Sequence, residues 1–322
     1  MTRAVGRRSI AALIFLFLLV LGLSLCRRGI LLSDEGFLLL EALDMLQGKV
    51  LYRDMDAFVA PGTWLLMAGV FSIVEPSVLA SRLPVLVCFL ATFGLAYRIV
   101  ARLGSPGYGI FCVVLLALAS VWAFPFWTFA WYSPFSILFV LLALERLLAW
   151  QQSRRTSALL ATGLGLGLAF VFKQNYGAYA AAGSVLLVLA TRAEEHGPAG
   201  RLLRDVLADA LRLGAGAACV ALPVIGYFVL QGAGAAFVDR LLLHPLEFLA
   251  RADIPYPSLA TLLAAEPLRE NTERLTYLAF LPNRLDVAIP VLHELGLVER
   301  LHVLLYWLPP LVFTVGSWRG LR

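Results

Sequence analysis

Two adjacent carboxylates, Asp34 and Glu35, follow the first apolar run of the chain and could carry its chemistry. A carboxylate at the edge of a membrane is partly desolvated, so it can act as a base or as a metal ligand. Neighbouring helical residues point about 100° apart, so the two side chains do not face each other like a glycosidase pair, and one of them is expected to react. The alternative is that both stabilise a helix N-terminus through its dipole.

Two cationic side chains are candidates for binding a phosphate group. Lys173 is one of two lysines in the sequence and stands at the end of an apolar run. Arg53 stands in a polar stretch that follows the two carboxylates. Each has a plainer interpretation: Lys173 as an interfacial lysine whose amine reaches water, and Arg53 as an exposed partner of Asp54 or Asp56.

The composition places these residues in a membrane protein. Of 322 residues, 61% are hydrophobic and 15% are charged, and the mean hydropathy is +0.84, whereas soluble domains contain about 25% charged residues. A water-soluble enzyme is therefore excluded. The net charge of +5 forms no continuous basic stripe, so nucleic-acid binding is not expected. The four cysteines lie in or beside apolar segments, so no disulfide framework is expected.

A helix that spans a membrane needs about 20 apolar residues, and runs of this kind predict an all-α polytopic membrane fold with about eight spans. We expect these spans at about 10–26, 79–101, 107–125, 134–150, 157–173, 175–191, 209–230 and 301–317. The first is expected to stay in place as an anchor, because no small-residue cleavage site follows it. The apolar stretch 61–74 is too short to span and predicts a lying or re-entrant helix.

The arginines predict the orientation of the spans. With 61–74 kept out of the count, the positive-inside rule puts the N-terminus and the arginine-rich turns in the cytoplasm. Residues 1–230 then form a membrane module whose first external segment is 27–78. Residues 231–300 form an external cap, and 301–322 form the last span with a short cytoplasmic end.

The first external segment has the periodicity of an amphipathic helix. Asp34, Glu41 and Asp44 fall near one face at about 100° per residue, whereas Phe37 and the leucines occupy the rest. This pattern predicts a helix lying on the membrane surface.

Two further groups of residues have ordinary explanations. The aromatic residues Trp127, Trp131 and Tyr132 are typical of an interfacial belt, with stacking on a sugar ring as the alternative. The histidines of the second external segment stand at no zinc-ligand spacing, so a zinc site is not expected.

The order of the motifs resembles that of a known family. The chain carries, in order, a span, Asp-Glu-Gly-Phe, an amphipathic helix, Gln-Gly-Lys-Val-Leu-Tyr-Arg-Asp, Pro-Gly-Thr, a short helix, Glu-Pro-Ser-Val-Leu-Ala-Ser-Arg-Leu and, later, Phe-Lys-Gln-Asn-Tyr-Gly. Over about 8–190 this order is similar to that of bacterial GT-C membrane glycosyltransferases. It most resembles glycosyltransferase family 39, related to protein O-mannosyltransferases and lipid A aminoarabinose transferases. The latter carry Glu-Lys where this chain has Val59-Ala60.

The resemblance implies transfer of a sugar from a polyprenyl-phosphate donor to a lipid, protein or glycan acceptor, on the external face of the bacterial inner membrane. It implies that Asp34, or alternatively Glu35, is the catalytic carboxylate. For the cation that offsets the charge on the donor phosphate, Lys173 is our first candidate and Arg53 a weaker one. The neighbouring residues expected at the substrate cavity are Tyr52, Asp54, Gln174 and Asn175. No separate cofactor is required, because the lipid supplies the leaving group, although a divalent metal could assist.

Two other classes of protein share parts of this pattern. A transporter of lipid-linked saccharides should carry ionisable groups near mid-span and inverted repeats, and the sequence shows neither. A non-catalytic scaffold of the GT-C type is the stronger alternative, because the aminoarabinose-transferase motif is missing. Loss of sugar transfer in Asp34→Asn would separate the enzyme from the scaffold.

Overall fold

The computed structural model describes residues 2–27, 32–122, 129–195 and 199–251, together with Leu304, Trp307, Leu308 and Leu311. Every regular element in these residues is a helix, which confirms the predicted all-α class for this part of the chain. The chain divides into two compact units, and the first contains Met1–Ser120 and Pro125–Glu247. All the contacts described below lie in this first unit.

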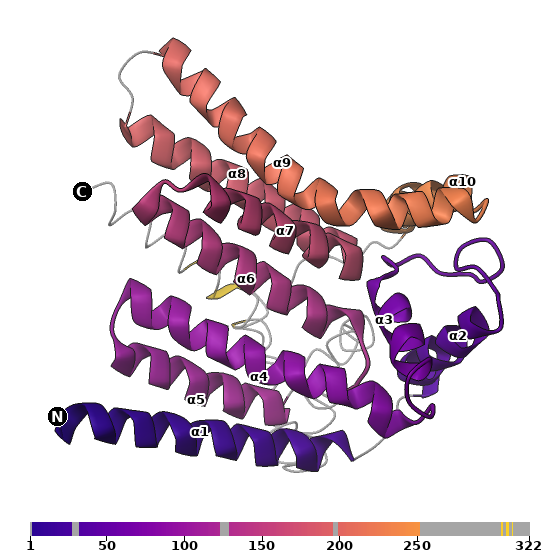
Figure 1. Cartoon of the computed structure of the whole chain (residues 1–322), viewed down its shortest axis with the longest axis horizontal. Helices are drawn as coiled ribbons and strands as arrows, with labels where there is room; N and C mark the ends of the chain where they lie inside the picture. The colour runs from indigo at the N-terminus through magenta and orange to yellow at the C-terminus, as the bar shows by residue number, and fades with distance from the viewer. Residues whose placement is uncertain are drawn as a thin grey trace, which may run out of the picture. The chain divides into compact units, whose positions relative to one another are not determined.

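Long helices form a bundle in the first unit (Figure 1). They are α1 (Thr2–Cys26), α4 (Val78–Leu103), α5 (Pro106–Trp122), α6 (Tyr132–Ser153), α7 (Thr156–Phe172), α8 (Gln174–Glu195) and α9 (Ala199–Leu230). The shorter elements are η1 (Leu32–Gly36), α2 (Phe37–Leu46), α3 (Gly62–Phe71), α10 (Gly234–Val238), η2 (Asp239–Leu243) and α11 (His244–Arg251). Consecutive long helices reverse direction, so α4, α6 and α8 run one way while α5, α7 and α9 run the other.

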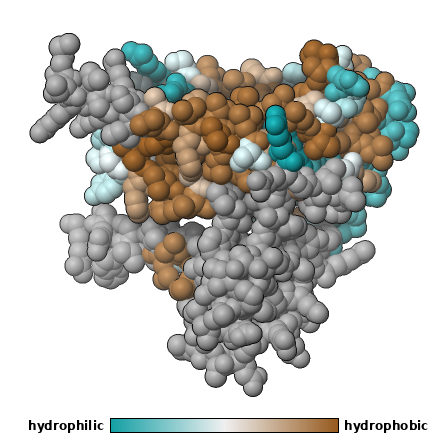
Figure 2. Space-filling model, turned by 90° about the horizontal axis from the view of Figure 1, so that it is seen from below, coloured by the Kyte–Doolittle hydropathy of each residue, from teal (hydrophilic) through white to brown (hydrophobic). Residues whose placement is uncertain are grey.

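Three of the described helices are long and apolar enough to cross a membrane: α4, α6 and the part of α9 from Arg201 to Leu230. The apolar parts of α1, α5 and α7 are shorter. The prediction of eight spans is therefore confirmed for three, and the expected span 301–317 lies almost wholly outside the described residues. Figure 2 shows hydrophobic residues over most of the described surface on one side of the unit, as a membrane protein requires.

Helix α7 lies at the centre of the second half of the bundle, between α6 and α9. A side chain at Gly163 would overlap the carbonyl oxygen of Leu213 on α9, and one at Gly167 would come within 2.8 Å of the carbonyl oxygen of Ala217. Gly165 faces α6 in the same way. The glycines thus allow the close helix approach that their spacing indicates.

Helix α3 confirms the short helix predicted in 61–74. It contains 10 residues, and a helix of that length covers about 15 Å, half of a hydrocarbon core. Gly62 at its start lies against the end of α7, where an added Cβ would come within 2.7 Å of the carbonyl oxygen of Val171. The start of α3 is therefore packed directly on the bundle.

Helix α2 differs from its prediction in the face that it buries. Its buried residues are Leu38, Leu39, Glu41 and Ala42. The grouping of Glu41 with Asp34 and Asp44 on one polar, water-facing side is wrong for Glu41, because α2 packs against α3 and this part of its surface meets protein.

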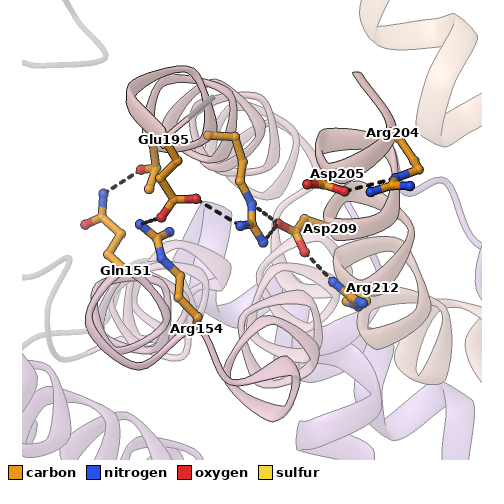
Figure 3. A network of polar contacts seen from close by, with 9 residues as sticks. Gln151, Arg154, Glu195, Arg204, Asp205, Asp209 and Arg212 are labelled. Carbon is orange, nitrogen blue, oxygen red and sulfur yellow. Dashed lines mark hydrogen bonds and ion pairs between the residues drawn. The ribbon is translucent and has the colours of Figure 1, made fainter. Parts of the chain in front are cut away.

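The end of the bundle formed by the last turns of α6 and α8 and the first turns of α9 holds a network of ion pairs (Figure 3). Asp209 is fully buried between Arg192, at 2.8 Å, and Arg212, at 2.5 Å. Glu195 pairs with Arg192 at 2.9 Å and with Arg154 at 2.5 Å. Arginines from three helices thus gather at one end of the bundle, and the assignment of that end to the cytoplasm stays a prediction.

Candidate functional site

A small cavity of about 90 Å³ lies beside η1 and α2, at the end of the bundle away from the arginine network. Its lining residues are Asp34, Phe37, Leu38, Asp56, Ala57, Phe58, Val59, Trp64, Trp131 and Tyr132. Two carboxylates and several aromatic rings therefore meet at one place. Burial raises the pKa of the Asp34 carboxyl above its ordinary value, which makes Asp34 a stronger base than an exposed aspartate.

A larger cavity, of about 480 Å³, opens between α1, α4 and α5. Its walls are mainly apolar, with Tyr97 and Ser105 as the polar side chains among them. Because this cavity contains no carboxylate and no cation, the smaller cavity beside Asp34 is the candidate for chemistry.

Glu35 is held in a buried ion pair with Arg82, and their exposed fractions are 0% and 1%. Arg82 donates from Nε and Nη2 to the two carboxylate oxygens at 2.8 and 2.5 Å, and from Nη1 to the carbonyl of Cys26 at 2.9 Å. The backbone N–H of Ala130 also donates to Glu35, at 3.3 Å. Since both oxygens of Glu35 are occupied, the geometry favours Asp34 as the reacting carboxylate.

Arg82 was not singled out from the sequence as a site residue, although a signal for it exists. It stands on α4 near the end that carries the carboxylates, whereas the positive-inside rule accounts for arginines at the other end. An arginine at this unexpected end of an apolar helix indicates a buried acidic partner.

Lys173 follows the last residue of α7 and lies among aromatic rings. Its Nζ donates to the hydroxyl of Ser133 at 2.8 Å and lies 5.0 Å from the ring centre of Tyr132 and 4.4 Å from that of Tyr176. Desolvation lowers the pKa of Lys173 to about 8. Because Tyr132 also lines the cavity with Asp34, the structure brings the predicted carboxylate and the predicted cation to the same region.

Gln174 fixes one wall of the cavity to the turn between α7 and α8. Its Nε2 donates to the carbonyl of Phe58 at 3.0 Å, and its Oε1 accepts from the N–H of Ala60 at 3.0 Å. Asn175 is exposed and accepts from the N–H of Tyr176 at 3.0 Å. Gln174 thus lies next to the cavity and holds it, whereas Asn175 is not part of its lining.

The other predicted residues belong to the loop that precedes α3. Arg53 donates to Asp54 at 3.0 and 2.8 Å and to the carbonyl of Gln231 at 2.7 Å. The hydrogen bond from Arg53 lowers the pKa of Asp54 to about 2. Tyr52 is buried and donates its hydroxyl to the carbonyl of Val59 at 2.7 Å. Tyr52, Arg53 and Asp54 do not line the cavity, and of the three Tyr52 supports its wall through the hydrogen bond to Val59.

The start of the segment 231–300 packs on the same loop. Arg240 of η2 pairs with Asp56 at 2.9 Å, and the ring of His244 lies 6.1 Å from that of Phe58. Both Asp56 and Phe58 line the cavity. The assignment of 231–300 to a cap stays a prediction, and 252–300 lie outside the described residues.

The described residues form no group of three or more His, Cys, Asp or Glu side chains that could hold a metal ion. Asp34 and Asp56 are the carboxylates that line the cavity, and two carboxylates are fewer protein ligands than a typical dedicated site supplies. We therefore derive no step through a metal, and assistance by a divalent ion stays a prediction.

Comparison with known families gives one match. Residues 59–199 match the family described as dolichyl-phosphate-mannose-protein mannosyltransferase. The matched segment begins at Val59 in the cavity wall and includes Lys173 and Gln174, while Asp34 precedes it. No curated protein and no solved structure matches the chain. The match supports the resemblance that the order of the motifs indicates.

Proposed function

We propose that the chain transfers a sugar from a polyprenyl-phosphate donor to an acceptor at the cavity that Asp34 lines, because residues 59–199 match the family described as dolichyl-phosphate-mannose-protein mannosyltransferase. The observation that supports this most is that Tyr132 lines the cavity together with Asp34, while Nζ of Lys173, outside the lining, lies 5.0 Å from the Tyr132 ring. Sugar transfer from a lipid phosphate needs a base for the acceptor and a cation for the leaving phosphate, and these two side chains provide both.

In the proposed reaction the acceptor attacks the anomeric carbon of the donor sugar while Asp34 takes its proton. The bond between that carbon and the phosphate oxygen breaks, and its electron pair leaves with the polyprenyl phosphate. Lys173 stabilises the negative charge that develops on this phosphate. With a pKa of about 8, Lys173 is mostly protonated at neutral pH and can perform this role.

The surroundings of the cavity suit a substrate with both a polar head and an apolar tail. Phe37 and Phe58 line the cavity and are exposed at its edge, where a lipid chain could pass between the cavity and the membrane. The rings of Trp131 and Tyr132 lie tilted against each other with their centres 4.5 Å apart, and aromatic rings can bind the apolar faces of sugars. The positive-inside rule supports an external position for the cavity, on a bacterial inner membrane, with the N-terminus in the cytoplasm.

Sugar transfer by purified protein tests the proposal, with dolichyl phosphate mannose and other polyprenyl-phosphate sugars as donors. Asp34→Asn should lower the rate by about 100-fold or more, because it removes the base. Lys173→Gln should lower it by at least about tenfold, because a charge-assisted contact to phosphate is lost.

The surface ion pair between Asp44 and Lys49, at 2.9 Å, provides matched controls. Asp44→Asn and Lys49→Gln remove the same chemical groups outside the cavity lining and should leave the rate within about twofold of the parent. An active Asp34→Asn protein would contradict the proposed role of Asp34. A parent protein that is inactive with every donor would favour a non-catalytic scaffold.

A further inference from the structure

Glu41 is a buried carboxylate that the proposed reaction does not use. It lies on α2 with an exposed fraction of 4%, and its Oε2 accepts a hydrogen bond of 2.8 Å from the indole Nε1 of Trp64 on α3. Burial of a carboxylate costs free energy unless hydrogen bonds compensate for the lost water. The hydrogen bond from Trp64 compensates in part for the burial of Glu41, and it fixes the position of the indole relative to α2.

Trp64 connects this contact to the cavity. Its indole, which is 5% exposed, is part of the cavity lining together with Asp34. The continuous run of η1 and α2 carries both Asp34, on η1, and Glu41, on α2. A single hydrogen bond thus joins the element that carries Asp34 to the opposite wall element, α3.

We propose that Glu41 is a positioning residue, which holds the Trp64 indole as a fixed wall of the cavity so that the sugar of the donor is bound in register with Asp34. This inference rests on the proposed function. An indole N–H can only donate, so its partner must be an acceptor placed on α2. Without that acceptor the buried indole N–H loses its hydrogen-bond partner, so the contact between α2 and α3 at the cavity is weakened.

The hydrogen bond, not the negative charge, is the feature that the cavity requires. Burial, and the nearby carboxylates of Asp44 and Asp56, raise the pKa of Glu41, whereas the hydrogen bond from Trp64 lowers it. A glutamine at this position retains an acceptor oxygen, and a leucine retains only the volume. The two substitutions therefore separate the hydrogen bond from the charge.

Kinetics of sugar transfer test this prediction in Glu41→Gln, Glu41→Leu, Trp64→Phe and the double variant Glu41→Leu/Trp64→Phe. Glu41→Leu and Trp64→Phe should each raise the KM for dolichyl phosphate mannose on the order of tenfold, and the double variant should be no worse than either. Glu41→Gln and the surface control Asp44→Asn should keep the parental KM. The pH profile should be unchanged in all of them, because Asp34 and Lys173 set it.

Two kinetic results would overturn the proposal. If Glu41→Gln lost as much as Glu41→Leu, the charge of Glu41 and not its hydrogen bond would matter. If the effects of Glu41→Leu and Trp64→Phe were additive, the two residues would act separately. Thermal unfolding of each variant shows whether it is folded, and Trp64→Phe replaces Glu41→Leu as the decisive variant if the latter does not fold.

A second measurement does not depend on activity. A cysteine introduced by Ala57→Cys lies in the cavity lining, and its labelling by a maleimide can be followed after replacement of the four native cysteines. Glu41→Leu should change the labelling rate about threefold or more, and Glu41→Gln should not change it. If the parent transfers no sugar, the proposed function fails, but the labelling rate still tests whether Glu41 holds the cavity wall. An unchanged labelling rate in Glu41→Leu would refute that role of Glu41.

Discussion

Replacement of Arg82 by leucine is the perturbation whose effect the structure defines most sharply. In the native protein Arg82 neutralises Glu35, and both side chains are fully buried. The substitution leaves the carboxylate of Glu35 without its counter-ion and the carbonyl of Cys26 without the donor that lies 2.9 Å away. Because neither group can reach water, the cost appears as lost stability.

The size of this loss follows from the burial. Removal of one partner of a buried ion pair typically costs about 3–5 kcal/mol. In a chain of this length each kcal/mol lowers the melting temperature by about 2 °C, so Arg82→Leu should melt about 6–10 °C below the parent. The double variant Glu35→Leu/Arg82→Leu removes both charges, so it should recover more than half of that loss.

Thermal unfolding in detergent measures these shifts, with Arg98→Leu as the matched control. Arg98 also pairs with a glutamate of α6, Glu145, at 2.7 Å, but its own side chain is 60% exposed. Glu145 is itself buried, but it keeps its ion pairs with Arg146 and with Arg102, at 3.8 Å, so the control should cost no more than about 1 kcal/mol. A drop in Arg82→Leu no larger than that of the control would refute the reasoning, and so would a double variant that is less stable than Arg82→Leu.

The same pair separates the two candidate carboxylates. Glu35→Gln still offers an oxygen to Arg82, so it should fold and keep measurable sugar transfer, whereas Asp34→Asn should be stable and inactive. Inactive but stable Glu35→Gln protein would show that Glu35 takes part in the reaction.

Three further predictions concern the cavity and the bundle. The value of kcat/KM should rise with pH as Asp34, whose pKa is raised, loses its proton, and it should fall above about pH 8 as Lys173 loses its own. Lys173→Arg should move this fall to higher pH. A fall that stays at the same pH would exclude Lys173 as its cause. Gln174→Leu removes two hydrogen bonds from the cavity wall, so limited proteolysis should cut the loop before α3 faster than in the parent by about tenfold. Gly163→Ala should lower the free energy of unfolding by about 1–3 kcal/mol, as measured by chemical denaturation. The control is Gly214→Ala, whose added methyl group meets no atom within 4 Å, so it should be neutral or stabilising by up to about 1 kcal/mol.

The sequence by itself determined the helices, because the length and apolarity of a run are local properties. The runs behind α4, α6 and α9 were long enough to predict spans, and 61–74 was short enough to predict the non-spanning helix α3. The gathering of arginines at one end of the bundle also follows from the sequence, since each one closes an apolar run.

The environment of each polar residue was decided by the tertiary structure. Helical periodicity predicted that Glu41 lies on the polar side of α2, but it could not show that Trp64 of α3 covers Glu41. In the same way, Tyr52 and Arg53 stood beside the expected site in sequence and belong to the loop behind it in space.

The pairs that build the site are far apart along the chain. Glu35 and Arg82 are separated by 47 residues, Lys173 and Ser133 by 40, and Gln174 and Phe58 by 116. No local pattern encodes such contacts, because they depend on which helix faces pack together and in what register. The sequence therefore determined which residues stand at the ends of helices, and packing of the bundle decided which of them meet Asp34 at the cavity and which only hold its walls.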